Sequence, residues 1–122
     1  MELRYFQLSE FDSPDLEGSG VNMNKYFLEK LDTLRQRCGF PLHISSGYRT
    51  KEYNIVVKGA LDSSHMRGVA ADIRCRGNHE RYVVLREAIR LGFNRIGVYN
   101  NHIHVDIDDT LVGNVIWTGV SR

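Results

Sequence analysis

Cysteine is scarce in this sequence. The 122 residues include two cysteines, Cys38 and Cys75, which are too few and too far apart to predict a disulfide framework or a Cys-x-x-Cys metal site. Cys75 follows Asp72 closely enough to be considered as a metal ligand. Its position in an alternating segment instead places it on the apolar side, so we interpret both cysteines as buried structural residues.

Long apolar runs, basic runs, repeats and low-complexity segments are also missing. No stretch approaches the ~20 apolar residues of a membrane span, and a net charge of +1 argues against a nucleic-acid surface. The first ten residues lack the apolar core of a secretory signal, so we expect the chain to be cytoplasmic at synthesis. The composition is that of one compact domain spanning residues 1–122, which we expect to be monomeric.

The segment from Ser63 to Asp72 combines a histidine, a glycine and a carboxylate. His65 and Asp72 are seven residues apart, which means ~10 Å along one helix or more than ~20 Å on opposite faces of one strand. A turn must bring them together, and Gly68 permits one because glycine tolerates backbone angles that other residues resist. Beyond Gly68 the residues alternate, which predicts a half-buried strand over 69–75 with Asp72 on its polar side.

A second alternating segment, 102–108, carries two more histidines. Its apolar residues point one way, whereas His102, His104 and two aspartates point the other. Histidines at i and i+2 of a strand share a face, with backbones roughly 6–7 Å apart, so both reach one small volume. Alone, His-x-His is more often an exposed strand face than a metal site. Together with His65 and Asp72 it indicates a catalytic zinc site with nitrogen and oxygen ligands and one position left for water.

Asp106 lies two residues past His104 on the same expected strand face, and two interpretations stay open. The carboxylate either orients a ligating histidine or is an exposed residue of the strand. His43 is likewise either a surface residue or a group behind the site.

Helices are predicted in three places. Apolar residues recur at three- and four-residue steps over 24–38, which predicts a helix that ends at Gly39. Thr50 is a candidate N-cap for a short helix that reaches about residue 57. Asn78 is a candidate N-cap for a third helix over 79–91, followed by a glycine.

Alternating segments predict the strands of an α+β fold. They cover 42–45, 69–75, 95–99 and 102–108. The dipeptide Asn100-Asn101 tolerates positive φ and predicts a hairpin between the last two. The final residues, with Trp117, add an edge strand or pack over the core.

These segments resemble those of a known family. Ser-x-His-x-x-Gly-x-Ala-x-Asp followed by His-x-His is similar to the zinc D-alanyl-D-alanine carboxypeptidases and dipeptidases. Their relatives include phage peptidoglycan endopeptidases and the zinc-bearing Hedgehog signalling domain. The resemblance extends upstream to 46–50 and Asn54 and downstream to 96–99, and it covers roughly residues 40–108. It implies a small antiparallel sheet that carries the zinc site and packs against two to three helices.

By this resemblance, His65, Asp72 and His104 would be the zinc ligands. Arg49 would bind the carboxylate of the substrate or polarise the scissile carbonyl, and Ser63 would support the site or the substrate. His102 would lie beside the metal-bound water.

One position departs from the family pattern. The dipeptidase branch and some phage enzymes place a glutamate general base three residues before the last zinc histidine, where this sequence has Asn101. Proton transfer would then fall to His102 or to an acidic residue that the sequence does not identify. The chain is more similar to the His-x-His carboxypeptidase branch.

The resemblance implies a zinc-dependent hydrolase of peptidoglycan peptides with D-amino acids, using zinc-activated water. It would be a D,D-carboxypeptidase or an endolysin-like endopeptidase. A phage origin would fit the missing signal, because phage lytic enzymes commonly accumulate inside the host before they reach the cell wall; a chain trimmed of its leader would fit as well. Asn101 keeps open a zinc-bearing binding domain without hydrolysis, and a metal-free domain with coincidental histidines is the third alternative.

Overall fold

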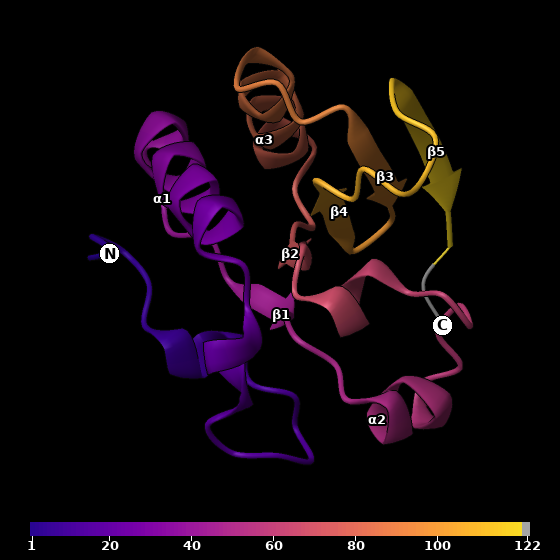
Figure 1. Ribbon diagram of the computed structural model, residues 1–122. Coiled ribbons are helices and arrows are strands. Elements are labelled where there is room, and N and C mark those ends of the chain that lie inside the picture. The colour runs from indigo at the N-terminus through magenta and orange to yellow at the C-terminus, as the bar shows by residue number, and fades with distance from the viewer. Residues whose placement is uncertain (121–122) are drawn as a thin grey trace.

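The computed structural model describes residues 1–120, which form helices and strands in the mixed order of an α+β fold (Figure 1). The α-helices in this range are α1 (Lys25–Cys38), α2 (Lys51–Val56) and α3 (Asn78–Arg90). The strands are β1 (Ile44–Ser46), β2 (Ala70–Arg74), β3 (Arg95–Tyr99), β4 (His102–Asp106) and β5 (Val115–Gly119). Short 3₁₀ turns lie at Leu8–Phe11, Ser19–Asn22 and Ser64–Arg67. The expected fold class is confirmed.

The five strands form one sheet in the order β1-β2-β4-β3-β5. All neighbours are antiparallel except β3 and β5, which run parallel. The sheet is therefore mixed, whereas the sequence led us to expect an antiparallel one. The reason is that β2 and β3 already occupy both edges of β4, so the chain leaving β4 crosses the end of β3 and pairs with its far edge.

Side-chain caps start the first two helices, at Thr50 as predicted and at Asn24, which the sequence led us to expect inside the first helix. The Asn24 side chain accepts a hydrogen bond from the Phe27 amide at 2.9 Å, and the Thr50 hydroxyl accepts one from the Tyr53 amide at 3.0 Å. Each bond satisfies one of the amides that a helix start leaves without a partner. At the other end of α1, Gly39 adopts φ +77°, the left-handed conformation that commonly terminates a helix.

Two local expectations were wrong in detail. Asn78 is the first residue of α3 instead of its cap; Gly77 precedes the helix and supplies no side chain. The Asn78 amide oxygen instead accepts a bond from Arg81 at 2.8 Å. Asn100-Asn101 does connect β3 to β4, but neither residue has positive φ; among the non-glycine residues of 1–120 only Lys58 and Asn114 do.

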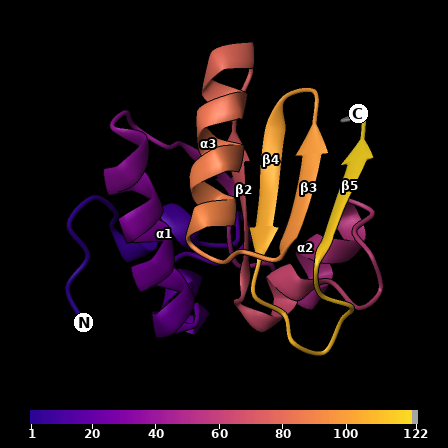
Figure 2. The ribbon, with the colours of Figure 1, turned by 90° about the horizontal axis from the view of Figure 1, so that it is seen from above.

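Helices α1 and α3 lie together on one face of the sheet, and α2 lies on the other side (Figures 1 and 2). The apolar residues of β2 and β4 point toward α1 and α3, and Cys38 and Cys75 are buried there. The same core takes in the following side chains: Phe27, Leu28, Leu31, Val84, Ile73, Ile103 and Val105. The opposite face of β2 and β4 therefore remains for polar residues.

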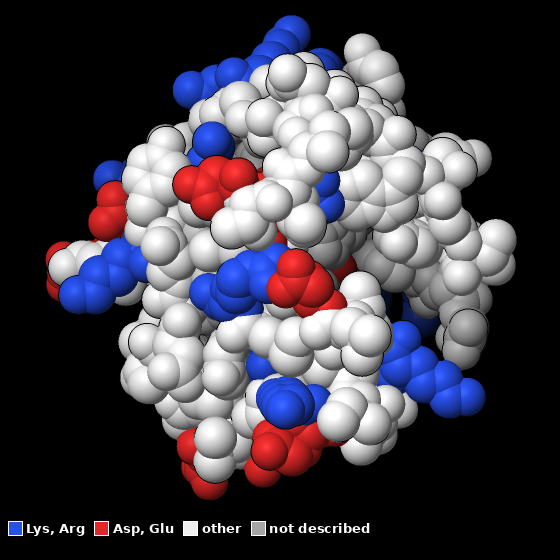
Figure 3. All heavy atoms as spheres, turned by 45° about the vertical axis from the view of Figure 1, so that its right-hand side comes forward, with Lys and Arg blue, Asp and Glu red and all other residues white. Residues whose placement is uncertain are grey.

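None of the helices within residues 1–120 is long and apolar enough to cross a bilayer. On the face shown in Figure 3, basic and acidic side chains lie in small groups among uncharged residues. Neither sign covers that face.

Candidate metal centre

One row across the sheet holds two of the three predicted zinc ligands, Asp72 and His104. In the strand ladders Asp72 of β2 pairs with His104 of β4, His104 pairs with Gly97 of β3, and Gly97 pairs with Trp117 of β5. All four belong to the face opposite α1 and α3. His65 joins them from the 3₁₀ turn that precedes β2.

The three side chains expected to bind zinc converge. His65 Nε2 lies 3.3 Å from Asp72 Oδ1, and His104 Nδ1 lies 2.9 Å from the same oxygen. One ligand atom from each residue lies within 4.8 Å of the other two. The strand ladder fixes Asp72 and His104 directly, because cross-strand partners on one face have neighbouring side chains.

The position of His65 depends on the turn that was expected around Gly68. The Ser63 hydroxyl accepts a hydrogen bond from the His65 amide at 3.2 Å and begins the turn. Gly68 ends it with φ +71°, and a Cβ at this position would collide with the backbone oxygen of Asn22. A glycine is therefore required for two reasons, its left-handed conformation and the close approach of another chain segment.

Both histidines are held from behind in the orientation that leaves one ring nitrogen for a metal. His65 Nδ1 donates to the backbone oxygen of Gly47 at 2.8 Å, so Nε2 faces Asp72. His104 Nε2 donates to Asp106 Oδ2 at 2.7 Å, so Nδ1 faces Asp72. Asp106 is 1% exposed and is itself bound by Arg95 at 2.8 Å. Of the two interpretations of Asp106, the structure shows the one in which it orients the histidine.

Burial and mutual charge shift the pKa values of the three residues. Burial lowers the pKa of His65, and Asp72 opposes this only in part. Burial would raise the pKa of Asp72, but His65 and His104 hold it well below its usual range. Against the effect of burial, hydrogen bonds to Asp106 and Asp72 raise the pKa of His104 to about 9. The centre thus holds an ionised carboxylate between two imidazoles, and it favours a positive charge that a proton or a metal ion can supply.

The donor set fits zinc. Donors at 2.0–2.2 Å from a tetrahedral zinc ion lie about 3.3 Å from one another, close to the distances around Asp72 Oδ1. Two imidazoles and one carboxylate are typical of a catalytic zinc site, and each imidazole has the supporting hydrogen bond that such ligands need. His65, Asp72 and His104 are therefore the residues that would hold the ion.

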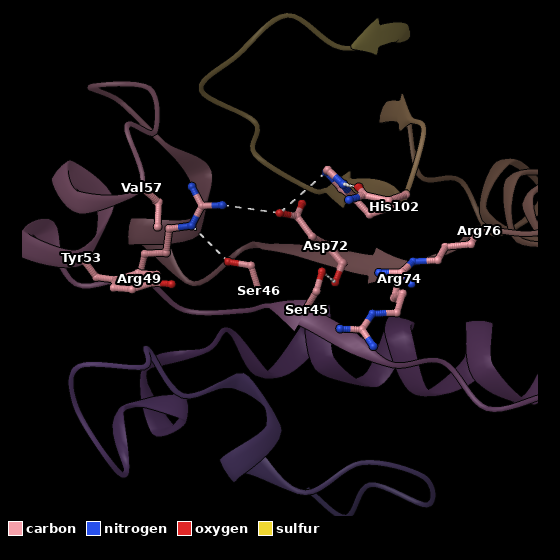
Figure 4. Close-up of a pocket in the computed structure, with 10 residues that line it drawn as sticks. Ser45, Ser46, Arg49, Tyr53, Val57, Asp72, Arg74, Arg76 and His102 are labelled. Carbon is pink, nitrogen blue, oxygen red and sulfur yellow. Dashed lines mark hydrogen bonds and ion pairs between the residues drawn. The ribbon is translucent and has the colours of Figure 1, made fainter. Parts of the chain in front are cut away.

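Arg49 reaches the same centre from the loop after β1. Its guanidinium donates to Ser46 Oγ at 3.0 Å and to Asp72 Oδ2 at 3.4 Å (Figure 4). It also donates to Asn54 Oδ1 at 3.3 Å. Burial lowers the pKa of Arg49, although Asp72 opposes that shift, and the group stays charged. Three partners, on β1, α2 and β2, therefore hold the planar guanidinium of Arg49 beside the candidate metal ligands.

His102 lies beside the centre but not in its innermost set. Its Nε2 is 4.0 Å from Asp72 Oδ2, and its Nδ1 bonds to the Asn101 amide oxygen at 2.7 Å. The ring stacks on Tyr99 with centroids 4.3 Å apart. Burial lowers the pKa of His102 despite the nearby Asp72, so the imidazole is neutral near pH 7. The bond from Asn101 thus holds the His102 ring so that Nε2 faces Asp72.

Two pockets meet at the centre. One of about 280 Å³ extends past Ser45 and Arg74 (Figure 4). The other, of about 440 Å³, extends past Ser63 and Trp117. Four residues line both pockets: Arg49, Val57, Asp72 and His102. The candidate metal centre is therefore open on two sides.

A comparison with known protein families agrees with this geometry. Residues 4–106 match the family described as Peptidase M15, the zinc D-Ala-D-Ala carboxypeptidase type. The chain belongs to the peptidase M15 family. M15 peptidases are zinc-dependent metallopeptidases, and the match includes all three residues of the candidate centre. No curated protein matches the sequence closely enough to count as a relative.

The M15 match is longer than the resemblance noticed in the sequence, because it begins near the N-terminus and not near residue 40. It ends at Asp106, the last residue of β4. Trp117 on β5 lies beyond it, yet its ring is 5.4 Å from that of His104 and lies against Gly97. A Cβ on Gly97 would approach Trp117 Cε2 to 2.7 Å, so this glycine makes room for the indole.

One buried polar cluster beside the M15 centre was not foreseen. Asp108 accepts hydrogen bonds from Ser64 at 2.6 Å and from the Thr110 hydroxyl at 2.6 Å, and it pairs with Arg67. The cluster ties the loop after β4 to the turn that carries His65. The sequence placed Asp108 on a strand, but β4 ends two residues earlier, and the spacing of these residues gives no signal for their contact.

Proposed function

We propose that this M15 protein is a zinc-dependent hydrolase of peptidoglycan peptides. The observation that carries the proposal is the convergence of His65 Nε2, Asp72 Oδ1 and His104 Nδ1, with both imidazoles oriented from behind, where two pockets meet. The metallopeptidase class rests on the family. The peptidoglycan substrate rests on the resemblance to the wall-degrading branch of that family.

In this proposal His65, Asp72 and His104 hold the zinc ion. When bound there, zinc supplies Lewis-acid activation of water and of the scissile carbonyl. Asp106 keeps His104 in the tautomer that presents Nδ1, and the Gly47 carbonyl does the same for Nε2 of His65.

Arg49 and Ser63 position the substrate. The guanidinium of Arg49 borders both pockets and is held by Ser46 and Asn54, so it can donate to the scissile carbonyl or to a substrate carboxylate. Ser63 supports the site by starting the turn that carries His65, and it lines the larger pocket.

His102 carries the proton transfer. Its Nε2 faces Asp72, and its Nδ1 bonds to Asn101, so Nε2 is the nitrogen that can accept a proton from water and pass it to the leaving amine. A lowered pKa keeps this imidazole in the accepting form at neutral pH. His102 would then perform the proton transfer that a glutamate at position 101 performs in some relatives.

Both kinds of cleavage fit a cleft that is open on two sides: removal of a terminal D-residue, or a cut inside the peptide as in a phage-type endolysin. Asn101 favours a second candidate function, because it stands where some relatives are expected to have a glutamate general base. In that case the protein would bind zinc and peptide without hydrolysis.

A turnover assay separates these functions. The protein, loaded with one zinc per chain and checked by elemental analysis, is incubated with purified peptidoglycan, and soluble products are identified by mass spectrometry. We expect peptide products that disappear when a chelator is added and return when zinc is restored. Released D-alanine would indicate a carboxypeptidase, and cross-bridge fragments would indicate an endopeptidase. A zinc-loaded protein that gives no product at all would contradict hydrolysis and favour the binding function.

A further inference from the structure

We propose that the smaller pocket is an anion subsite in which Arg74 and Arg76 bind a carboxylate of the substrate, so that the protein prefers peptides with a free carboxylate within about two residues of the cleaved bond. This inference rests on the proposed function, because it names the chemistry of the substrate at that same cleft. It concerns two residues that neither the zinc site nor the proton transfer uses.

The strand register places Arg74 next to the centre. Arg74 is two residues beyond Asp72 on β2 and is the cross-strand partner of His102. Two residues along a strand correspond to about 6–7 Å on the same face. An extended peptide covers that distance with about two residues. A group held by Arg74 would therefore lie one or two residues from the carbonyl that is attacked.

Arg76 approaches the same pocket from the segment after β2. It has the same parity as Asp72 and Arg74, and both arginines line the smaller pocket. Figure 4 shows their side chains at the end opposite Arg49, with Asp72 between in this view. The hydroxyls of Ser45 and Ser46 also line this pocket, which gives it further hydrogen-bonding groups.

The charge balance of the pocket is positive. Three arginines line it, and the one carboxylate among its lining residues is Asp72. That carboxylate is already shared by His65, His104 and Arg49. Within residues 1–120 no ion pair joins Arg74 or Arg76 to a carboxylate of the protein, and both side chains are exposed. Two guanidinium groups without an internal counter-ion, beside a catalytic centre, favour an anionic ligand.

A carboxylate is the anion that matches a peptide substrate. Guanidinium groups bind carboxylates through two parallel hydrogen bonds, which adds geometry to the charge attraction. A peptide can supply this group as its C-terminus or as an acidic residue. Both sources supply the same carboxylate group. Synthetic peptides in which one or the other carboxylate is converted to a carboxamide distinguish them.

The test uses one peptidoglycan stem peptide in four forms with the zinc-loaded full chain. Its C-terminus is a carboxylate or a carboxamide, and its glutamate carries a free carboxylate or a carboxamide. We expect kcat/KM to be on the order of tenfold higher for the form with the recognised carboxylate. This preference should be smaller at high salt, because salt screens charges on exposed arginines. The pair of peptides that shows the difference identifies the source of the carboxylate.

Substitution of the two arginines tests whether the pocket causes this preference for a carboxylate. In Arg74→Gln/Arg76→Gln the ratio of kcat/KM for the acid form to that for the amide form should fall to within about twofold of one. The reason is that glutamine lacks both the positive charge and the paired N–H donors of the guanidinium. In Arg37→Gln, an exposed arginine of α1, the ratio should equal that of the unmodified protein. A ratio near one in the unmodified protein, or one that survives the double substitution, would overturn the inference.

Binding measurements keep this test independent of hydrolysis. The same four peptides are titrated into the zinc-loaded protein by calorimetry. Tighter binding of an acid form that depends on Arg74 and Arg76 would support the subsite even if no peptide were cut, and the proposed hydrolysis alone would then fail. Equal binding of acid and amide forms would overturn the subsite while leaving hydrolysis untouched.

Discussion

The candidate metal centre and the rim of the cleft are built in different ways. At the centre, His65 and Asp72 are 3% and 8% exposed, and the histidines are fixed by a backbone carbonyl and a buried carboxylate. At the rim, Arg49, His102 and Trp117 are half-buried. Their side chains contact the side chains of Ser46, Asn101 and His104, respectively. The centre is thus coupled to the fold, whereas the rim can change without unfolding the sheet. Substitutions should divide along the same line.

The largest effect should follow removal of a centre residue. His104→Ala should abolish zinc binding and with it hydrolysis, because two ligands do not hold a catalytic zinc ion. The melting temperature should fall on the order of 10 °C, since bound zinc at a hundred times its Kd stabilises the native state by about 2.7 kcal/mol. Elemental analysis and thermal unfolding measure both.

His79→Ala is the matched control, because this histidine is exposed on α3 away from the sheet face that carries the centre. It should keep zinc and stability. Full zinc content in His104→Ala would show that the three residues do not form the metal site.

The next largest effect should come from His102 at the rim. His102→Ala should keep zinc and fold but lose on the order of 10²–10⁴-fold in kcat, the usual contribution of a positioned acid or base. Asn101→Ala should lose much less, because it only orients the ring. Loss of zinc in His102→Ala would make this histidine a ligand, and unchanged turnover would move the proton transfer to another residue.

A smaller loss is expected from Arg49→Lys. Lysine keeps the charge but cannot donate in parallel to Ser46, Asn54 and a substrate oxygen. Zinc content and circular dichroism should be unchanged, while kcat/KM falls on the order of 10–100-fold, equivalent to about 1.4–2.8 kcal/mol. Turnover close to that of the unmodified protein would show that Arg49 does not contact the substrate.

The smallest change in activity and a clear change in stability should come from Asp108, which supports the His65 turn from outside the cleft. Its pKa lies well below the usual range because hydrogen bonds from Ser64, Thr110 and Arg67 outweigh burial. Its contribution to stability is therefore present above the unfolded-state pKa of about 3.9 and is lost as pH falls below it.

Urea unfolding tests this contribution. Asp108→Asn should lower the free energy of unfolding by about 1–3 kcal/mol at pH 7, and the difference from the unmodified protein should shrink toward pH 2. The exposed neighbour in Asp109→Asn should show neither effect. A difference that stays constant with pH would mean that ionisation of Asp108 is not what stabilises the cluster.

Local patterns in the sequence predicted the strand faces and the turn of the candidate centre, and the family resemblance brought His104 together with His65 and Asp72. Strand alternation placed Asp72, His102 and His104 on one face, and Gly68 indicated the turn that brings in His65. The family match supports the chemistry that these patterns suggested. The side-chain cap at Thr50 was equally predictable, since it bonds to an amide three residues away.

Features that depend on distant segments were not readable. The parallel pairing of β5 with β3 follows from which sheet edges are already filled, and no residue of β5 records that. The contact between Ser64 and Asp108 joins residues 44 positions apart. Asn100-Asn101 forms the hairpin without positive φ, because the tertiary pairing of β3 and β4 decides the turn and not the preference of the dipeptide.

The indole of Trp117 shows where this architecture leaves freedom for change. The wall that it forms beside His104 comes from the outermost strand, past the last residue shared with the family, and it rests on a glycine instead of on a metal ligand. A change in β5 would therefore alter this wall of the pocket, while Asp72 on β2 and His104 on β4 would keep their places. Gly97 constrains such an exchange, because a side chain at this position would collide with the indole. Gly119 is a second constraint, because a Cβ there would collide with the ring of Tyr99.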